Sequence, residues 1–270
     1  QIKAQDPSLK IDKKQARRMD NLFVNLKEIV EANHLDKDIF ALEISEYAKL
    51  FMKCFRRDDE DGEFDVPSSF GLERISFIIN NLDSNTMIPY VLYIMNSVSS
   101  QEERNKIFGF LETYVIRRLI VDSNNNNYSD LFSENLIGQR INSYEALREY
   151  ILSKDSTASL AMPSDIAVRN GFHQTHFKSN NKRALCILYL LESLLQTPNH
   201  STQLKTFGAY TLEHLMPKKW KKHWPCENGS EEDRDLLILT FGNLAMITSG
   251  LNNTIRNYDW ATKLIGKNNK

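Results

Sequence analysis

Two short segments near the C-terminal end hold the residues whose types and spacing can do chemistry. In YTLEHLMPKKW, Glu213 and His214 are adjacent at the end of a β-prone run. In FGNLAMITSGLNNTIRN, Asn243 stands at a turn and Asn252 follows nine residues later. A carboxylate and an amide oxygen of this kind suit a hard cation such as Mg²⁺, Mn²⁺ or Ca²⁺.

A cation held by Glu213 and by Asn252 or Asn253 would stabilise charge on a phosphate and on its leaving oxygen. A neutral His214 imidazole beside it would take a proton from an attacking water. Side chains alternate across a strand, so His214 points away from Glu213 unless the strand bends. Residue spacing therefore leaves two interpretations open, a phosphodiester-hydrolysing site and a packed histidine at a strand end.

The elements that carry these residues have the order of a ββα unit, at about residues 208–265. Short β-prone runs predict strands near 209–215 and 243–248, joined by a long loop. A last helix is expected to carry Leu251, Ile255 and Trp260.

Upstream of residue 200 the pattern is helical. Apolar residues recur at helical spacing, and few glycines and prolines interrupt them. The 39–55 helix is apolar enough to predict burial, whereas 155–182 reads as irregular and polar. The predicted fold is therefore mostly α, a helical bundle with a small α+β element near the C-terminus. The predicted helices cover residues 20–33, 39–55, 72–82, 89–97, 101–123, 131–152 and 183–196.

Composition places the chain among soluble globular proteins, with 41% apolar and 26% charged residues over 270 positions. The formal charge of −1 excludes a uniformly basic coat for nucleic acid, but it allows a local basic patch. In one such patch, basic residues alternate with Trp220 and Trp224. These residues either contact the phosphate backbone of a nucleic acid or form a solvated basic loop. Its basic residues are Lys218, Lys219, Lys221 and Lys222.

Three scattered cysteines with no CxxC indicate neither a disulfide framework nor a cysteine zinc site, which favours a reducing compartment. No apolar run approaches the roughly 18–20 residues that cross a bilayer, and no signal segment stands at the N-terminus. The sequence also begins without Met. We expect an intracellular piece of a longer protein with no membrane segment.

The string EHLMP … FGNLAMI … LNNTIRN … K resembles the HNH-type, or His-Me finger, nuclease signature. More narrowly, it resembles the C-terminal nuclease domain of GmrSD-type modification-dependent restriction enzymes. That resemblance covers about residues 100–265, with the motif itself in 210–263.

The resemblance implies a role for each matched residue. His214 matches the general base and Glu213 the acidic partner at a Mg²⁺ or Mn²⁺ ion. Asn243 matches a loop asparagine that orients the histidine or the turn, and Asn252 matches the helix asparagine at the metal. Lys263 matches a later position that is structural or faces a phosphate, so it joins the expected DNA contacts.

The resemblance also implies a metal-dependent DNA endonuclease, the cleavage half of a bacterial anti-phage protein that acts on modified or phage DNA in the cytoplasm. Residues 1–100 are then a helical connector, and 101–270 hold a helical lead-in and the nuclease domain. The family's N-terminal NTP-hydrolysing sensing domain has no counterpart in this sequence, so it is an expected partner. The alternative is a non-catalytic helical module that binds DNA or a protein.

Overall fold

The structure, a computed structural model, is mostly helical with one two-stranded sheet near its C-terminal end. It describes residues 22–55, 66–67, 69–82, 84–177, 181–197, 199, 203–224 and 229–265.

The first part of the chain is built from helices. Their bounds are Leu22–Ala32 (α3), Lys37–Phe55 (α4), Leu72–Asn81 (α5), Ile88–Ser97 (α6), Gln101–Ile120 (α7) and Tyr144–Leu152 (α8). A 3₁₀ turn at Asn85–Met87 (η2) precedes α6, and a π-helical segment at Asp130–Leu136 (η3) precedes α8.

The second part combines helices with the sheet. It contains Asp165–Gln174 (α9), Asn181–Leu195 (α10), Tyr210–His214 (β1), Glu231–Leu237 (α11), Leu244–Thr248 (β2), Ser249–Ile255 (α12) and Trp260–Ile265 (α13). Short 3₁₀ turns lie at Phe207–Ala209 (η4), Trp220–Lys222 (η5) and Phe241–Asn243 (η6).

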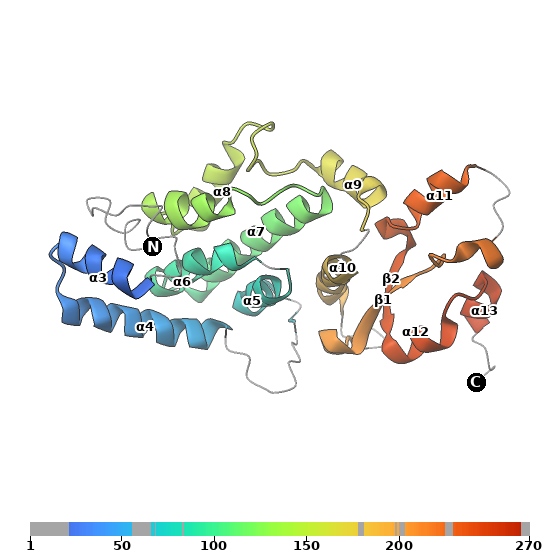
Figure 1. Ribbon diagram of the computed structural model, residues 1–270, viewed down its shortest axis with the longest axis horizontal. Helices are drawn as coiled ribbons and strands as arrows, with labels where there is room; N and C mark the ends of the chain where they lie inside the picture. The colour runs from blue at the N-terminus through green and yellow to red at the C-terminus, as the bar shows by residue number, and fades with distance from the viewer. Residues whose placement is uncertain are drawn as a thin grey trace.

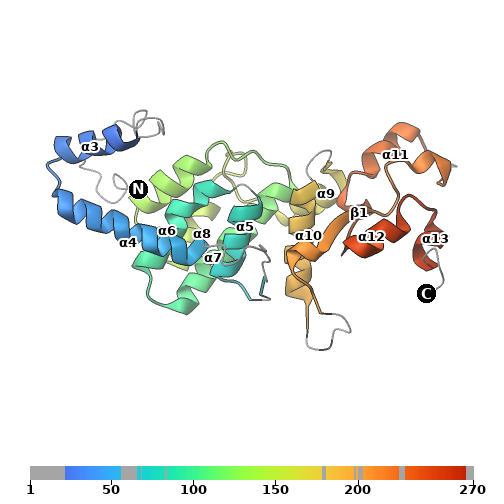
Figure 2. The ribbon, with the colours of Figure 1, turned by 60° about the horizontal axis from the view of Figure 1, so that its bottom comes forward.

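The elements are strung along one long axis. In both views α3 and α4 lie at one end, α11 to α13 lie at the other, and α10 lies between the upstream helices and the sheet (Figures 1 and 2). One buried cluster nevertheless runs from Cys54 in α4 to Leu244 in β2. The sheet is therefore supported by the helices rather than attached as a separate unit.

A buried ion pair ties three of these helices together. Arg74 of α5 is fully buried, and its Nε donates to the Glu112 carboxylate of α7 at 2.8 Å. The same guanidinium donates to Ser193 Oγ at 2.6 Å and to Leu190 O at 3.0 Å, both in α10. Because a buried charge must be paired and hydrogen-bonded, this network specifies how α5, α7 and α10 pack.

Serine caps explain where several helices begin. Ser100, Ser143 and Ser164 each accept a hydrogen bond from the backbone N–H three residues later, at the starts of α7, α8 and α9. Pro89 lies in the first turn of α6, where its missing N–H costs nothing.

The predicted strands are confirmed as β1 and β2, and the described residues before position 200 form helices, turns and loops without a strand. None of the described helices is both long enough and apolar enough to cross a membrane.

Four expectations about helices are wrong. The 39–55 helix is not buried, because among the described residues α4 packs mainly against α5 and α6 and leaves its other side exposed. Residues 155–182 are not irregular throughout, since α9 forms there. The 131–152 segment divides into η3 and α8, and the last helix breaks into α12 and α13 at Arg256, whose φ is 39°. The exposed apolar residues of α4 are Ile39, Leu42, Ile44, Phe51 and Met52.

Candidate functional site

The two strands form an antiparallel hairpin whose faces have different partners. Its register pairs Glu213 with Ala245 and His214 with Leu244. Tyr210 and Leu212 pack against the hydrophobic core on one face. By strand alternation Glu213 belongs to the opposite face, which α12 and α13 cover.

Glu213 is buried and paired with Lys263 of α13. The Lys263 ammonium, itself buried, contacts Glu213 Oε1 and also donates to the His214 carbonyl oxygen at 3.0 Å. Lys263 therefore neutralises the carboxylate and closes α13 onto the end of β1. This burial does not suit the surface DNA contact that the sequence analysis expects of Lys263.

His214 ends β1 with its imidazole unsatisfied. Its Nε2 atom is buried and has no hydrogen-bond partner within the described part of the chain. Burial, helped by the positive charges of Lys218 and Lys263, lowers the pKa of His214 to about 4. The imidazole is therefore neutral at physiological pH, and its Nε2 is not engaged by the described residues.

Asn243 holds the chain that follows His214. Its Oδ1 accepts from Met216 N at 2.8 Å, and its Nδ2 donates to Met216 O at 2.9 Å and to Ile238 O at 3.0 Å. Its own carbonyl oxygen accepts from Leu215 N at 2.9 Å. One side chain in η6 thus fixes the backbone immediately after the histidine.

Asn252 reaches β1, whereas its neighbour does not. Asn252 Nδ2 donates to Thr211 Oγ1 at 2.9 Å, and Thr211 shares a strand face with Glu213. Asn253 is exposed, and its carbonyl oxygen accepts from Arg256 Nε at 3.0 Å. Thr211 was missed by the sequence analysis, although its alternation with Glu213 along β1 was a usable signal.

The structure brings these residues together only in part. Asn252 and Glu213 lie on one face of β1, and Asn243 supports the loop after His214. Within the described residues no hydrogen bond joins the His214 imidazole to Glu213 or Asn252. Their convergence on one reacting group stays a prediction.

The lysines of the loop after β1 are exposed, whereas Trp220 is buried and Trp224 is half-buried. Trp220 is only 2% exposed, and its Nε1 donates to Asp235 Oδ1 at 2.7 Å, so it offers no stacking platform to a base. Lys221 is exposed and pairs with Glu231 at 2.5 Å. The other exposed basic residues of this loop are Lys218, Lys219 and Lys222.

Few of the described side chains near the end of β1 could coordinate a metal ion. Among the described residues no cluster of three His, Cys, Asp or Glu side chains can hold an ion. A hard cation also accepts amide and water oxygens, so the Glu213 carboxylate and the side-chain amide oxygen of Asn252 or Asn253 suit one. Binding at Glu213 requires the Lys263 ammonium to leave the carboxylate.

Comparison with known proteins supports the resemblance seen in the motifs. The family described as "GmrSD restriction endonucleases, C-terminal domain" matches residues 162–269, a segment that runs from just before α9 past α13. The match covers less than half of the 270-residue chain. No curated protein and no solved structure matches the chain.

Proposed function

We propose that this chain contains a DNA endonuclease domain that hydrolyses phosphodiester bonds as the cleavage part of a bacterial restriction protein. The match of residues 162–269 to a domain of restriction endonucleases supports a nuclease-related role. Its substrate would be modified or phage DNA in the cytoplasm. An NTP-hydrolysing sensing domain is the expected partner, with residues 1–100 as the connector to the lead-in and nuclease at 101–270.

The observation that carries the proposal is the state of His214. A general base must be neutral and must have a nitrogen free to accept a proton. Nε2 has no partner among the described residues, and burial keeps the imidazole neutral by lowering its pKa to about 4. Because Nε2 is buried, an attacking water reaches it only when the surrounding side chains move. A histidine with a purely structural role is expected to satisfy both ring nitrogens.

In the proposed reaction His214 Nε2 accepts a proton from water as the water oxygen forms a bond to phosphorus. The bond from phosphorus to the leaving sugar oxygen breaks, and that oxygen takes a proton from solvent. Asn243 keeps the backbone after His214 in place through its bonds to Met216. The exposed ammonium of Lys218 lies near enough to lower the His214 pKa, and it would attract the phosphate.

Glu213 and Asn252, with Asn253 as the neighbouring candidate, would hold a divalent cation, Mg²⁺ or Mn²⁺. Such a cation stabilises negative charge on the phosphate and on the leaving oxygen. The exposed Lys218, Lys219, Lys221 and Lys222 would contact the DNA backbone.

One observation favours the alternative, a non-catalytic module that binds DNA or a protein. The carboxylate that would hold a cation already has Lys263 as its counter-charge. A DNA cleavage assay separates the two functions.

The test is supercoiled plasmid or phage DNA incubated with Mg²⁺ or Mn²⁺ and either the wild-type chain or His214→Ala. Loss of a general base should slow cleavage about 10²–10⁴-fold while the circular dichroism spectrum stays unchanged. His34→Asn, in the exposed turn between α3 and α4, is the control histidine. Cleavage by His214→Ala at the wild-type rate would remove the nuclease assignment for this site.

A further inference from the structure

The outer face of α9 carries a stripe of residues able to read DNA bases. Its exposed positions recur at the spacing of one helix face, and the apolar member, Ile166, is 73% exposed. Arginine pairs with the major-groove edge of guanine, and asparagine or glutamine pairs with that of adenine. The stripe consists of Ile166, Arg169, Asn170, His173 and Gln174.

The opposite side of α9 is fixed firmly to the end of α7. Arg117 donates to Pro163 O at 2.8 Å and pairs with Asp165 at the start of α9. At the far end Thr175 Oγ1 donates to Ile120 O at 2.6 Å. Gly171 packs so closely there that an added Cβ would stand 2.6 Å from Ile120 O. The exposed stripe is therefore presented by an immobilised helix.

Aromatic contacts also fix α9 relative to the candidate active site. The ring centroids of Phe172 in α9 and Phe241 in η6 are 5.0 Å apart. Phe177, just after α9, packs against Phe241 at 4.5 Å and donates its N–H to Leu239 O at 2.9 Å. Because η6 also contains Asn243, DNA held by α9 would have a defined position relative to the His214 end of β1.

The charges around this face suit a polyanion. Two acidic residues near this face are each paired. Asp165, the first residue of α9, pairs with Arg117, and Asp122, just after α7, pairs with Arg183 at 3.2 Å. The stripe itself contains Arg169 and no carboxylate.

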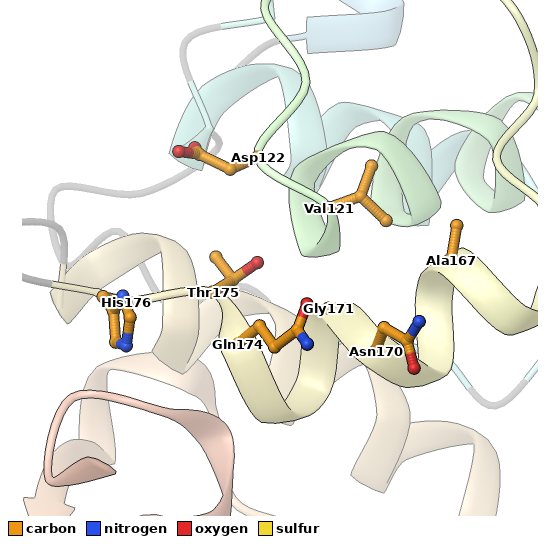
Figure 3. Close-up of a pocket in the computed structure, with 8 residues that line it drawn as sticks. All are labelled: Val121, Asp122, Ala167, Asn170, Gly171, Gln174, Thr175 and His176. Atoms are coloured by element: carbon orange, nitrogen blue, oxygen red, sulfur yellow. The ribbon is translucent and has the colours of Figure 1, made fainter. Parts of the chain in front are cut away.

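A cavity beside α9 leaves the side-chain amides of Asn170 and Gln174 open to a ligand. The cavity has a volume of about 630 Å³, and Asn170 and Gln174 line its α9 side one turn apart (Figure 3). Val121 and Asp122 border it from the end of α7. These amides are therefore accessible to a ligand rather than enclosed by the fold.

We propose that α9 enters the major groove of duplex DNA and contacts base edges through Arg169, Asn170 and Gln174. This inference rests on the proposed function, because it names how the same domain holds its substrate. The major groove, about 12 Å wide, admits one α-helix, and Ile166 would meet the methyl group of thymine there.

The test measures binding in EDTA by the full chain carrying His214→Ala, so that no cleavage occurs. The probe is a mixed-sequence duplex, prepared with ordinary purines or with 7-deazapurines. The 7-deazapurines lack the N7 acceptors of the major groove but keep every phosphate. We expect the His214→Ala chain to bind 7-deaza DNA at least about tenfold more weakly, since the loss of a single bidentate contact costs about that factor.

Adding Arg169→Ala, Asn170→Ala and Gln174→Ala should weaken binding to ordinary DNA and abolish its preference over 7-deaza DNA. The control is Arg148→Ala, which removes an exposed arginine from α8. The inference is overturned if the triple change matches the control, if it weakens binding to both DNAs equally, or if the His214→Ala chain binds no duplex. Plasmid cleavage by the wild type is measured separately. If the wild type cleaves DNA but the α9 substitutions leave DNA binding unchanged, only this inference is refuted and the proposed function stands.

Discussion

The Lys263 ammonium bonds both the Glu213 carboxylate and the His214 carbonyl oxygen, so one side chain of α13 holds the end of β1. The two ionised residues are 50 positions apart in sequence and both are buried. The stability of the site and its capacity for a cation therefore depend on the same carboxylate.

Lys263→Met should destabilise the chain by about 3–5 kcal/mol, because it leaves a buried carboxylate without its partner. The double change Lys263→Met with Glu213→Gln should recover most of that loss. Urea unfolding measures the free energy of unfolding of the single and the double variant. Lys221→Met is the control, since its pair with Glu231 is exposed and its loss should barely change the free energy of unfolding. Equal losses for Lys263→Met and Lys221→Met would contradict the structural role given to the buried pair.

His214 should make unfolding depend on pH in a specific window. Its pKa is about 4 in the folded protein, against an ordinary value of 6.5. Between these values the unfolded chain binds a proton that the folded chain does not, so this residue's contribution lowers stability as pH falls. Between about pH 7 and pH 5 the wild type should lose more unfolding free energy than His214→Gln. An NMR titration of the imidazole with a midpoint near 6.5 would refute the effect.

Asn243→Ala should cost about 1–3 kcal/mol, because it leaves backbone groups of Met216 and Ile238 without their partner. DNA cleavage should fall as well, since the backbone after His214 is released. Asn243→Asp keeps the acceptor for Met216 N but sets a carboxylate oxygen against the carbonyl oxygens of Met216 and Ile238, so its stability should fall at least as far. An unchanged melting curve for Asn243→Ala would show that these bonds do not hold the loop.

Asn252→Ala should raise the Mg²⁺ or Mn²⁺ concentration needed for half-maximal cleavage, by roughly 10–100-fold. Thr211→Val removes only the hydrogen bond to Asn252, so it separates positioning of the amide from loss of a ligand. If Asn253→Ala produces the shift and Asn252→Ala does not, the ligand is Asn253. Unchanged metal dependence in both variants would exclude either amide as a ligand.

Local sequence patterns determined which segments are helices and where the two strands lie. Apolar spacing along 72–82 and 101–123 predicts α5 and α7, because a helix buries one face at a fixed period. The order of strand, loop, strand and helix around Glu213, His214 and Asn252 was likewise readable. Those features depend on neighbours within a few positions.

The tertiary structure decided which charges meet and which faces are covered. The sequence left Lys263 either structural or facing a phosphate, and the fold makes it the buried partner of Glu213. Trp220 faces Asp235 rather than solvent. Helix α9 was missed because it is short and polar, although Ser164 caps it; its contacts with Arg117 and Ile120 of α7 hold it in place. Such contacts join residues far apart in the chain, and only packing of the whole domain brings them within bonding distance.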